Sequence, residues 1–283
     1  MSDCNGNCSA CASRGSCGEP KEDPVKKALE HIKHVYIVLS GKGGVGKSTV
    51  AANLAIGLAK RGQRVGLLDV DVHGPSAPKI MGLQGQRAMG DGEKLIPLES
   101  YGVLVMSTGL ILEKPDEPIV WRGPLKAGVI KQFIGEVAWG DLDYLIVDCP
   151  PGTGDEPLSI CQLIPDATGA VLVTTPQQVA TLDVSKSVTF CNQIGIRIAG
   201  LIENMSGFTC PHCGEFTPIF KTGGGAKLAE QYGIPLLGKL PIATEIGESG
   251  DEGEPFVAKY ADSPAGKAFM DTVDVLLAVT AGA

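Results

Sequence analysis

The feature that most constrains this chain is a glycine-rich run, Gly41-Lys42-Gly43-Gly44-Val45-Gly46-Lys47-Ser48-Thr49, which fits the pattern G-x-x-x-x-G-K-[ST]. An apolar run precedes it and a helical pattern follows it, which is the context that this pattern requires. Glycines allow successive N–H groups to point at one phosphate, and the helix that begins near Lys47 adds its N-terminal dipole. The sequence therefore predicts a phosphate site in which Lys47 reaches the β- and γ-phosphates and Ser48 binds Mg²⁺.

Short apolar runs alternate with helical patterns along most of the chain. Continuous apolar runs are typical of strands buried on both faces, and the alternation predicts parallel βαβ units. The expected strands are Val35–Leu39, Val65–Leu68, Val103–Met106, Tyr144–Val147, Ala170–Thr174, Ile198–Ile202 and Leu236–Leu240, and the expected helices are 47–61, 124–138, 180–194, 224–232 and 264–279. A short helix is also expected from Asp23-Pro24 to about His34. The predicted fold is α/β, a Rossmann-like P-loop NTPase with a mostly parallel central sheet and helices on both faces.

Two of the apolar runs end in carboxylates. Asp148 closes the run Leu145-Ile146-Val147, which is how a carboxylate is presented to Mg²⁺ or to its water shell. Asp69 and Asp71 close the run that begins at Gly66, and we expect Asp71 to position the attacking water and Asp69 to support the magnesium shell. Lys42 is a second lysine in the phosphate loop, where a cation can stabilise transition-state charge, across a dimer if two copies meet there.

The nine cysteines are unevenly placed. Cys4, Cys8, Cys11 and Cys17 crowd the first seventeen residues, and Cys210 and Cys213 form a C-P-H-C. Crowded cysteines in a reducing compartment indicate metal or cluster ligands rather than disulfides. Cys149, Cys161 and Cys191 stand singly in apolar contexts that are typical of core residues.

Charge and composition narrow the partners and the compartment. The net charge of -8 disfavours nucleic acid and anionic lipid as partners. The N-terminus has no apolar signal region and no apolar run is long enough to span a bilayer, so we expect a cytoplasmic protein without membrane contact. We expect two parts: a cysteine-rich tail at 1–23 that needs a metal to order it, and an ATPase domain at 24–283 with a C-x-x-C loop at 204–225.

The C-x-x-C pair supplies two thiolates, whereas tetrahedral zinc or a cubane cluster needs four ligands. A two-fold axis between two copies would supply the missing pair, because an isologous interface repeats each residue. A zinc site shared with the tail, a redox dithiol and a plain loop remain open readings of the residues, and spacing alone does not distinguish zinc from iron–sulfur.

Several motifs together carry a family resemblance. They are K-G-G-V-G-K-S at 42–48, D-x-D-x-x-G-P-S at 69–76, D-x-P-P-G-T-G-D at 148–155, T-T-P-Q at 174–177, E-N-M-S at 203–206 and C-P-H-C at 210–213. With these motifs the chain resembles the deviant-Walker-A ATPases, and within them the Mrp/ApbC/Nbp-type iron–sulfur cluster carriers, over about 33–260.

The resemblance implies a homodimer with Lys42 acting in trans, Asp71 in switch I, Asp148 in switch II and Asn204 on the adenine base. It implies a [4Fe–4S] cluster bridged by Cys210 and Cys213 of both subunits, with apo iron–sulfur proteins as recipients and cluster-assembly proteins as donors. ATP rather than GTP follows from the same resemblance. The tail resembles the four-cysteine site of the family's longer members, which implies a second cluster. Cys8, Cys11 and Cys17 match that spacing, whereas the gap after Cys4 is shorter than the family's.

Three functions are consistent with these motifs. The first is an ATP-hydrolysing carrier that assembles and transfers [4Fe–4S] clusters, in which nucleotide moves the switches and alters the hold on the bridging cluster. The second is a MinD/ParA-like positioning ATPase, which needs a basic face or membrane helix that this acidic chain lacks and leaves the clustered cysteines unexplained. The third is a nitrogenase-reductase-like electron donor, whose cluster cysteines belong at positions other than Cys149 and Cys161.

Overall fold

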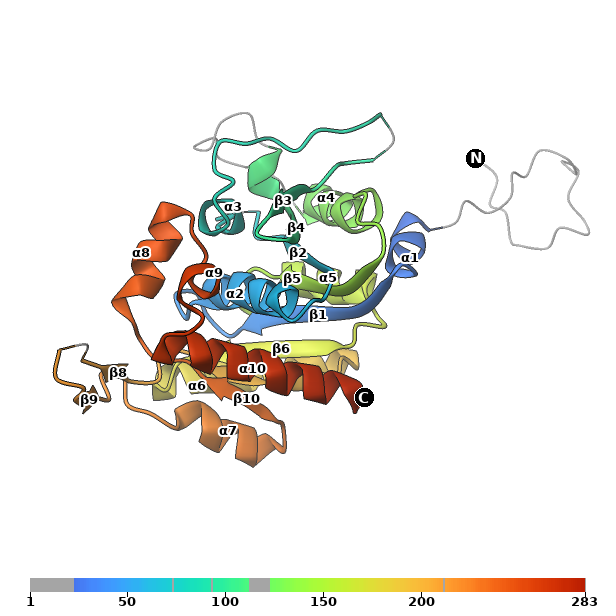
Figure 1. The fold of residues 1–283 in the computed structure, drawn as a ribbon. Coiled ribbons are helices and arrows are strands. Elements are labelled where there is room, and N and C mark those ends of the chain that lie inside the picture. The colour runs from blue at the N-terminus through green and yellow to red at the C-terminus, as the bar shows by residue number, and fades with distance from the viewer. Residues whose placement is uncertain (1–22, 73, 93, 112–122, 211, 283) are drawn as a thin grey trace, which may run out of the picture.

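Eight strands of the described residues form one central sheet in the order β10-β7-β6-β1-β5-β2-β4-β3 (Figure 1). The structure is a computed structural model, and it describes residues 23–282 except 73, 93, 112–122 and 211. All neighbouring strands pair in parallel apart from the edge strand β3, which is antiparallel to β4. The predicted α/β class with a mostly parallel sheet is confirmed.

Each of the expected strands is present, and most extend by one to three residues beyond the apolar run that predicted them. In sheet order they are β10 (Leu236–Lys239), β7 (Ile198–Glu203), β6 (Gly169–Thr174), β1 (Ile32–Ser40), β5 (Leu142–Asp148), β2 (Val65–Asp69) and β4 (Val103–Ser107). The short edge strand β3 (Leu98–Ser100) was not predicted. A separate antiparallel pair, β8 (Phe208–Thr209) and β9 (Phe216–Thr217), forms a small hairpin.

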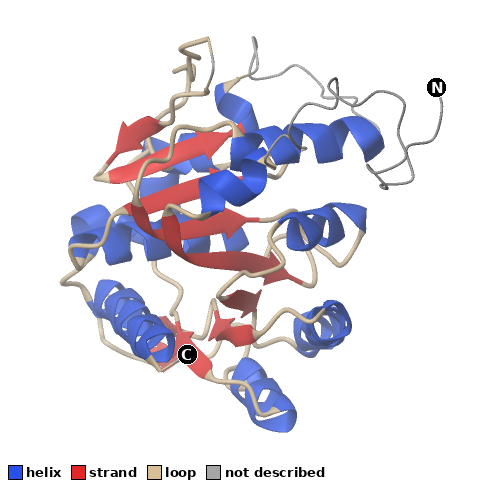
Figure 2. Ribbon diagram, turned by 90° about the vertical axis from the view of Figure 1, so that its right-hand side faces the viewer, coloured by secondary structure: helices blue, strands red, loops and turns tan. Residues whose placement is uncertain are grey.

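Helices cover both faces of the sheet, and each face has its own hydrophobic core (Figure 2). One face carries α2 (Lys47–Lys60), α3 (Ala77–Ile80), α8 (Thr244–Glu252), α9 (Phe256–Tyr260) and α10 (Pro264–Ala281). The other carries α1 (Pro24–Leu29), α4 (Gly123–Gly135), α5 (Asp155–Leu163), α6 (Gln178–Ile194) and α7 (Gly224–Tyr232). None of the helices in the described ranges is long and apolar enough to cross a bilayer.

The first helix is shorter than predicted. Asp23 caps α1 as expected, accepting a hydrogen bond from the Val25 N–H, but the helix ends at Leu29 rather than near His34. Strand β1 instead begins at Ile32, where it pairs with Leu142 of β5. The local sequence favoured a helix up to His34, but long-range pairing with β5 places the residues from Ile32 onward in a strand.

The carboxyl ends of the parallel strands meet along one edge of the sheet, and polar side chains cluster there. Asp69 of β2 lies in register with Asp148 of β5 and with Ser107 of β4. On the other side of β1, Thr174 of β6 pairs with Glu203 of β7. This edge is where open α/β sheets bind their ligands, and it is the edge that carries the glycine-rich loop.

Candidate nucleotide site and thiol hairpin

The glycine-rich loop joins β1 to α2, and its shape explains its glycines. Gly44 and Gly46 have positive φ angles of 80° and 82°, which L side chains rarely adopt. At Gly46 a Cβ would also collide with the Asn204 side-chain amide, and at Gly41 it would collide with the Asp183 backbone. The loop is therefore held close to α6 and to the end of β7, with its N–H groups at the N-terminus of α2.

Lys47 and Asp148 form a buried ion pair at the centre of the site. The Lys47 Nζ lies 2.5 Å from Asp148 Oδ1 and 3.2 Å from Ser48 Oγ. Burial alone lowers the pKa of Lys47, but the Asp148 charge and hydrogen bond raise it above its ordinary value, so the lysine stays charged. Asp148 Oδ2 is buried without a hydrogen-bond partner among the described residues, an unsatisfied acceptor suited to a magnesium-bound water.

Asp69 holds the loop that follows β2. Its Oδ1 accepts from the Asp71 N–H at 3.0 Å, and its Oδ2 accepts from the Ala77 N–H and the Ser107 Oγ, each at 3.1 Å. Burial, and then the nearby Asp148 charge, raise the pKa of Asp69. Both oxygens are thus occupied in shaping the loop, and a place for Asp69 in the magnesium shell stays a prediction.

A cavity of about 240 Å³ brings together the predicted phosphate and catalytic residues. Lys42, Lys47, Ser48 and Asp71 all line it, together with most of the glycine-rich loop. The Asp71 N–H donates to the Asp69 carboxylate, and Asp71 Oδ1 accepts from the Gly74 N–H at 3.2 Å. These two hydrogen bonds set the orientation of the Asp71 carboxylate. The fold therefore places two lysines, the Ser48 hydroxyl and the Asp71 carboxylate around a space next to a helix N-terminus, an arrangement suited to phosphoryl chemistry.

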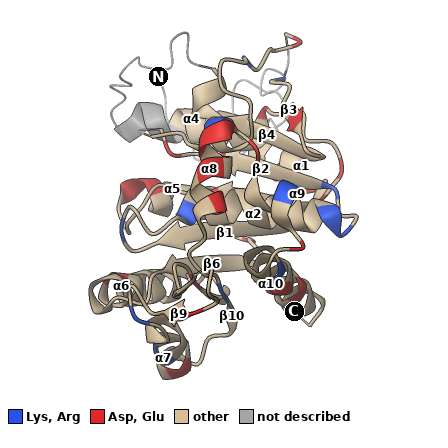
Figure 3. Cartoon of the chain, turned by 60° about the vertical axis from the view of Figure 1, so that its left-hand side comes forward, with Lys and Arg blue, Asp and Glu red and all other residues tan. Residues whose placement is uncertain are grey.

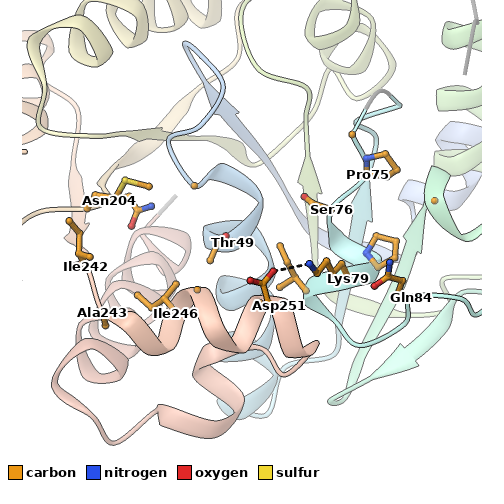
Figure 4. A pocket seen from close by; sticks show the side chains of 18 of the residues that line it. Thr49, Pro75, Ser76, Lys79, Gln84, Asn204, Ile242, Ala243, Ile246 and Asp251 are labelled. Carbon is orange, nitrogen blue, oxygen red and sulfur yellow. Dashed lines mark hydrogen bonds and ion pairs between the residues drawn. The ribbon is translucent and has the colours of Figure 1, made fainter. Parts of the chain in front are cut away.

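A second cavity of about 750 Å³ continues from the first and shares Gly46, Thr49, Ser76 and Ile80 with it. Asn204 lines this cavity, and its Nδ2 donates to the Val45 carbonyl at 2.9 Å (Figure 4). The far wall is α8, whose acidic residues are coloured red in Figure 3, and an ion pair between Lys79 and Asp251 at 2.8 Å crosses to it. The Asn204 contact with adenine stays a prediction, and the Asn204 side chain is on the wall of a cavity large enough for a base and ribose.

The C-x-x-C pair lies in the hairpin formed by β8 and β9. The Cys210 N–H donates to the Glu215 carbonyl, and the Gly214 N–H donates to the Cys210 carbonyl, each at 2.9 Å. Backbone N–H groups of Cys213 and then His212 face the Cys210 sulfur and lower its pKa, which favours a thiolate. Cys210 is half-buried and Cys213 is exposed, so the pair is accessible to a metal or a second chain.

No group of three or more metal-ligating side chains occurs among the residues that the structure describes. The hairpin therefore offers two thiols and needs ligands from elsewhere to complete a cluster. Cys149, Cys161 and Cys191 are buried core residues, as predicted, and burial raises the pKa of each thiol. The predicted ligands Cys4, Cys8, Cys11 and Cys17 lie outside the described residues.

The sequence did not identify two polar residues at strand ends as residues of the site. Ser107 bonds to Asp69, and Glu203, although it stands in a recognised motif, had no role assigned. A polar residue that ends an apolar run was the available signal for both, but such residues also end strands without any function.

The fold and the site together define a P-loop NTPase. A family profile described as "ParA: NUBPL iron-transfer P-loop NTPase" matches residues 31–277, and the chain belongs to this family. It is 48% identical over 256 residues to the iron-sulfur cluster carrier protein of Saccharolobus solfataricus, covering 90% of this chain and 86% of that protein.

A further relative and two solved structures also resemble this chain. The chain is 45% identical to the human cytosolic Fe-S cluster assembly factor NUBP2, covering 89% of this chain and 95% of that one. A nucleotide-binding protein from Archaeoglobus fulgidus, solved with ADP, superposes with a TM-score of 0.76 at 40% identity, covering 87% and 96% of the two chains. The cell division ATPase MinD from Pyrococcus furiosus has a TM-score of 0.64 at 23% identity, covers 87% of this chain and 99% of that one, and shares the fold.

Proposed function

We propose that this protein is an ATP-hydrolysing carrier that assembles [4Fe–4S] clusters and transfers them to apo-proteins. Its working form is a homodimer in which Cys210 and Cys213 of both subunits hold one cluster. The single observation that carries this proposal is the thiol hairpin, which is accessible and supplies half of a four-thiolate site. The names of the relatives, cluster carriers and cluster assembly factors, support the same cargo.

The nucleotide half of the proposal is supported by the cavity at the glycine-rich loop. Backbone N–H groups and Lys47 hold the phosphates, while Ser48 and the unsatisfied Asp148 oxygen fit a hydrated Mg²⁺, which would neutralise charge on the phosphates. Asp71 orients the water that attacks the γ-phosphorus, and the bond to the leaving ADP oxygen breaks. Lys42 of the partner subunit stabilises the charge that develops there. The structure of a relative with ADP supports a nucleotide at this site.

We further propose a cytoplasmic protein of two parts, a cluster-binding tail at 1–23 and the ATPase domain at 24–283. In the tail Cys4, Cys8, Cys11 and Cys17 hold a second cluster. Cytosolic assembly factors among the relatives support the compartment. Cluster-assembly proteins would act as donors to both sites.

The test is anaerobic reconstitution of the full chain, followed by measurement of iron, acid-labile sulfide and zinc. The unaltered chain is compared with the double variant Cys210→Ser/Cys213→Ser and with Cys8→Ser/Cys11→Ser. Cys191→Ala, which removes a buried core thiol, serves as the matched control. We expect iron with matching sulfide in the unaltered chain, a partial loss in each double variant, and no loss in the control.

Two outcomes would contradict the proposal. One is stoichiometric zinc in place of iron and sulfide. The other is an iron content that the Cys210→Ser/Cys213→Ser substitution leaves unchanged, which would remove the bridging cluster. ATP hydrolysis followed on the same samples separates the two halves of the proposal, because hydrolysis without a cluster would return the protein to the broader class of positioning ATPases.

A further inference from the structure

Glu203, the last residue of β7, has a fully buried carboxylate with three donors from the chain. Its Oε1 accepts from Ser206 Oγ at 2.5 Å and from the Gly223 N–H at 2.9 Å, and its Oε2 accepts from the Gly225 N–H at 2.5 Å. Burying a carboxylate is costly unless it is hydrogen-bonded, and bonds to a charged acceptor are the stronger kind. Glu203 is therefore firmly held in one geometry.

These three donors stand at the two ends of the segment that carries the thiol pair. Ser206 is at the start of the segment, and Gly223 and Gly225 are at its end, where α7 begins. The carboxylate also sits at the N-terminus of α7, where a negative charge is favoured. A Cβ at position 225 would lie 2.9 Å from Leu201 Cδ2 and 3.1 Å from Glu203 Oε2, so a side chain there would crowd the carboxylate. Glu203 thus closes the base of the loop 204–223.

The next residue, Asn204, is bound to the phosphate loop. Its side chain donates to the Val45 carbonyl and fills the space beside Gly46, while its backbone N–H donates to the Thr174 carbonyl at 2.7 Å. Two consecutive residues at the end of one strand therefore bind the nucleotide site on one side and the base of the thiol loop on the other.

The backbone between this pair and the thiols has little freedom. Met205 adopts a positive φ of 57°, which is uncommon for a residue with a side chain, and Gly207 follows with 85°. A Cβ on Gly207 would collide with the ring of Phe216 on β9. The Ile242 N–H donates to the Gly207 carbonyl at 2.7 Å. The segment between Asn204 and the hairpin is thus held to β9 and to Ile242.

We propose that Glu203 is a positioning residue that couples the state of the phosphate loop to the thiol hairpin. When nucleotide binds to the phosphate loop, the Val45 carbonyl moves, and the Asn204 side-chain amide that is hydrogen-bonded to it moves with it. Because Glu203 links Asn204 to both ends of the loop 204–223, the accessibility of Cys210 and Cys213 changes with it. This inference rests on the proposed function for its biological meaning, but its test needs no cluster.

The experiment measures alkylation of Cys210 and Cys213 by iodoacetamide in the reduced, cluster-free full chain, with and without Mg–ADP. Peptide mass spectrometry separates these thiols from the others, and nucleotide affinity is measured on the same samples. Glu203→Gln removes the charge and leaves an amide that accepts through one oxygen. Ser206→Ala is a milder variant that removes one of the three donors. Glu230→Gln, an exposed carboxylate on α7, is the matched control.

In the unaltered chain and in Glu230→Gln we expect Mg–ADP to change the alkylation rate by roughly fivefold or more. In Glu203→Gln the thiols should react faster and lose this response, while the nucleotide affinity stays within about threefold, because Glu203 is not in the phosphate cavity. Ser206→Ala should show a reduced response, and it decides the matter if Glu203→Gln does not fold.

A Glu203→Gln protein whose thiols still respond to nucleotide as in the unaltered chain would overturn the inference. So would an unaltered chain that binds Mg–ADP without any change in its thiols, and this result would leave the proposed cluster function standing. Absence of nucleotide binding in the unaltered chain would overturn the proposed function and the inference together.

Discussion

At the scale of single residues, Gly46 is where backbone conformation and the nucleotide site meet. Gly46→Ala would place a side chain at a φ of 82° and against the Asn204 amide. We expect a loss of about 1 to 2 kcal/mol in the free energy of unfolding from the backbone strain, and at least about a tenfold loss of nucleotide affinity from the displaced loop. Urea unfolding and calorimetric titration with Mg–ADP measure the two effects.

Gly62 provides the matched control, since its φ is 79° but a Cβ there would meet nothing within 4 Å. Gly62→Ala should lose a similar amount of stability and keep its nucleotide affinity. Equal affinities in the two variants would show that Gly46 has no special role at the site.

Lys42 is the residue whose role depends most on a second subunit. Lys42 lines the phosphate cavity. Among the described residues it forms no ion pair, in contrast to Lys47, which pairs with Asp148. Lys42→Ala should lower the ATP hydrolysis rate by about 10³-fold and change nucleotide affinity little, because the charge that it stabilises develops in the transition state. Lys60→Ala, on the exposed end of α2, is the control for loss of a lysine. Hydrolysis that survives in Lys42→Ala would refute a catalytic role for this residue.

At the scale of elements, Asp143 ties together the beginnings of three neighbouring strands. It accepts from the Arg64 N–H at 2.9 Å and from its guanidinium, and it pairs with Lys33 at 2.8 Å. These hydrogen bonds, Arg64 first, hold its pKa well below the ordinary value of 3.8. Because the folded pKa is the lower one, the stabilisation is complete above the unfolded pKa and is lost as the pH falls below it.

Asp143→Asn should therefore lower the free energy of unfolding by about 1 kcal/mol at neutral pH, and the difference should shrink below pH 3.8. Denaturant unfolding at a series of pH values measures it. Asp141→Asn breaks only an exposed pair with His31 and should have little effect. If the difference in the free energy of unfolding between Asp143→Asn and the unaltered chain grew toward low pH, the hydrogen bonds of Asp143 would not be the source of the stabilisation.

Elements with a strong apolar signal were predictable from sequence, and those without it were not. The strands buried on both faces were predicted from their continuous apolar runs. In contrast, α8 is the polar segment Thr244–Glu252, in which Ser249 is the one buried residue, so nothing in its pattern marked it as a helix. The end of α1 was misplaced because the pairing of Ile32 with Leu142 depends on a residue far along the chain.

The same distinction applies to the site. The glycine-rich loop is local in sequence, so one motif predicted its place and its contacts. The partners of Glu203 come from residues 206, 223 and 225, and their approach depends on the path of the whole intervening loop. The hydrogen bonds of Asp69 to Ala77 and Ser107 likewise depend on the loop after β2 and on the register of β4.

At the scale of the whole molecule, the proposed homodimer needs a face that includes the phosphate loop. Val179 and Leu182 are one turn apart on α6, 66% and 65% exposed, and the α6 backbone at Asp183 packs against Gly41. Leu182→Glu should raise the dimer dissociation constant about tenfold in sedimentation with an ATP analogue, and ATP hydrolysis should fall with it if Lys42 acts across the interface. Val275→Glu, on α10 against the opposite face of the sheet, should change neither quantity. Because hydrolysis and dimerisation are linked only through Lys42, a monomeric Leu182→Glu protein that still hydrolyses ATP at the full rate would place all catalytic groups within one subunit.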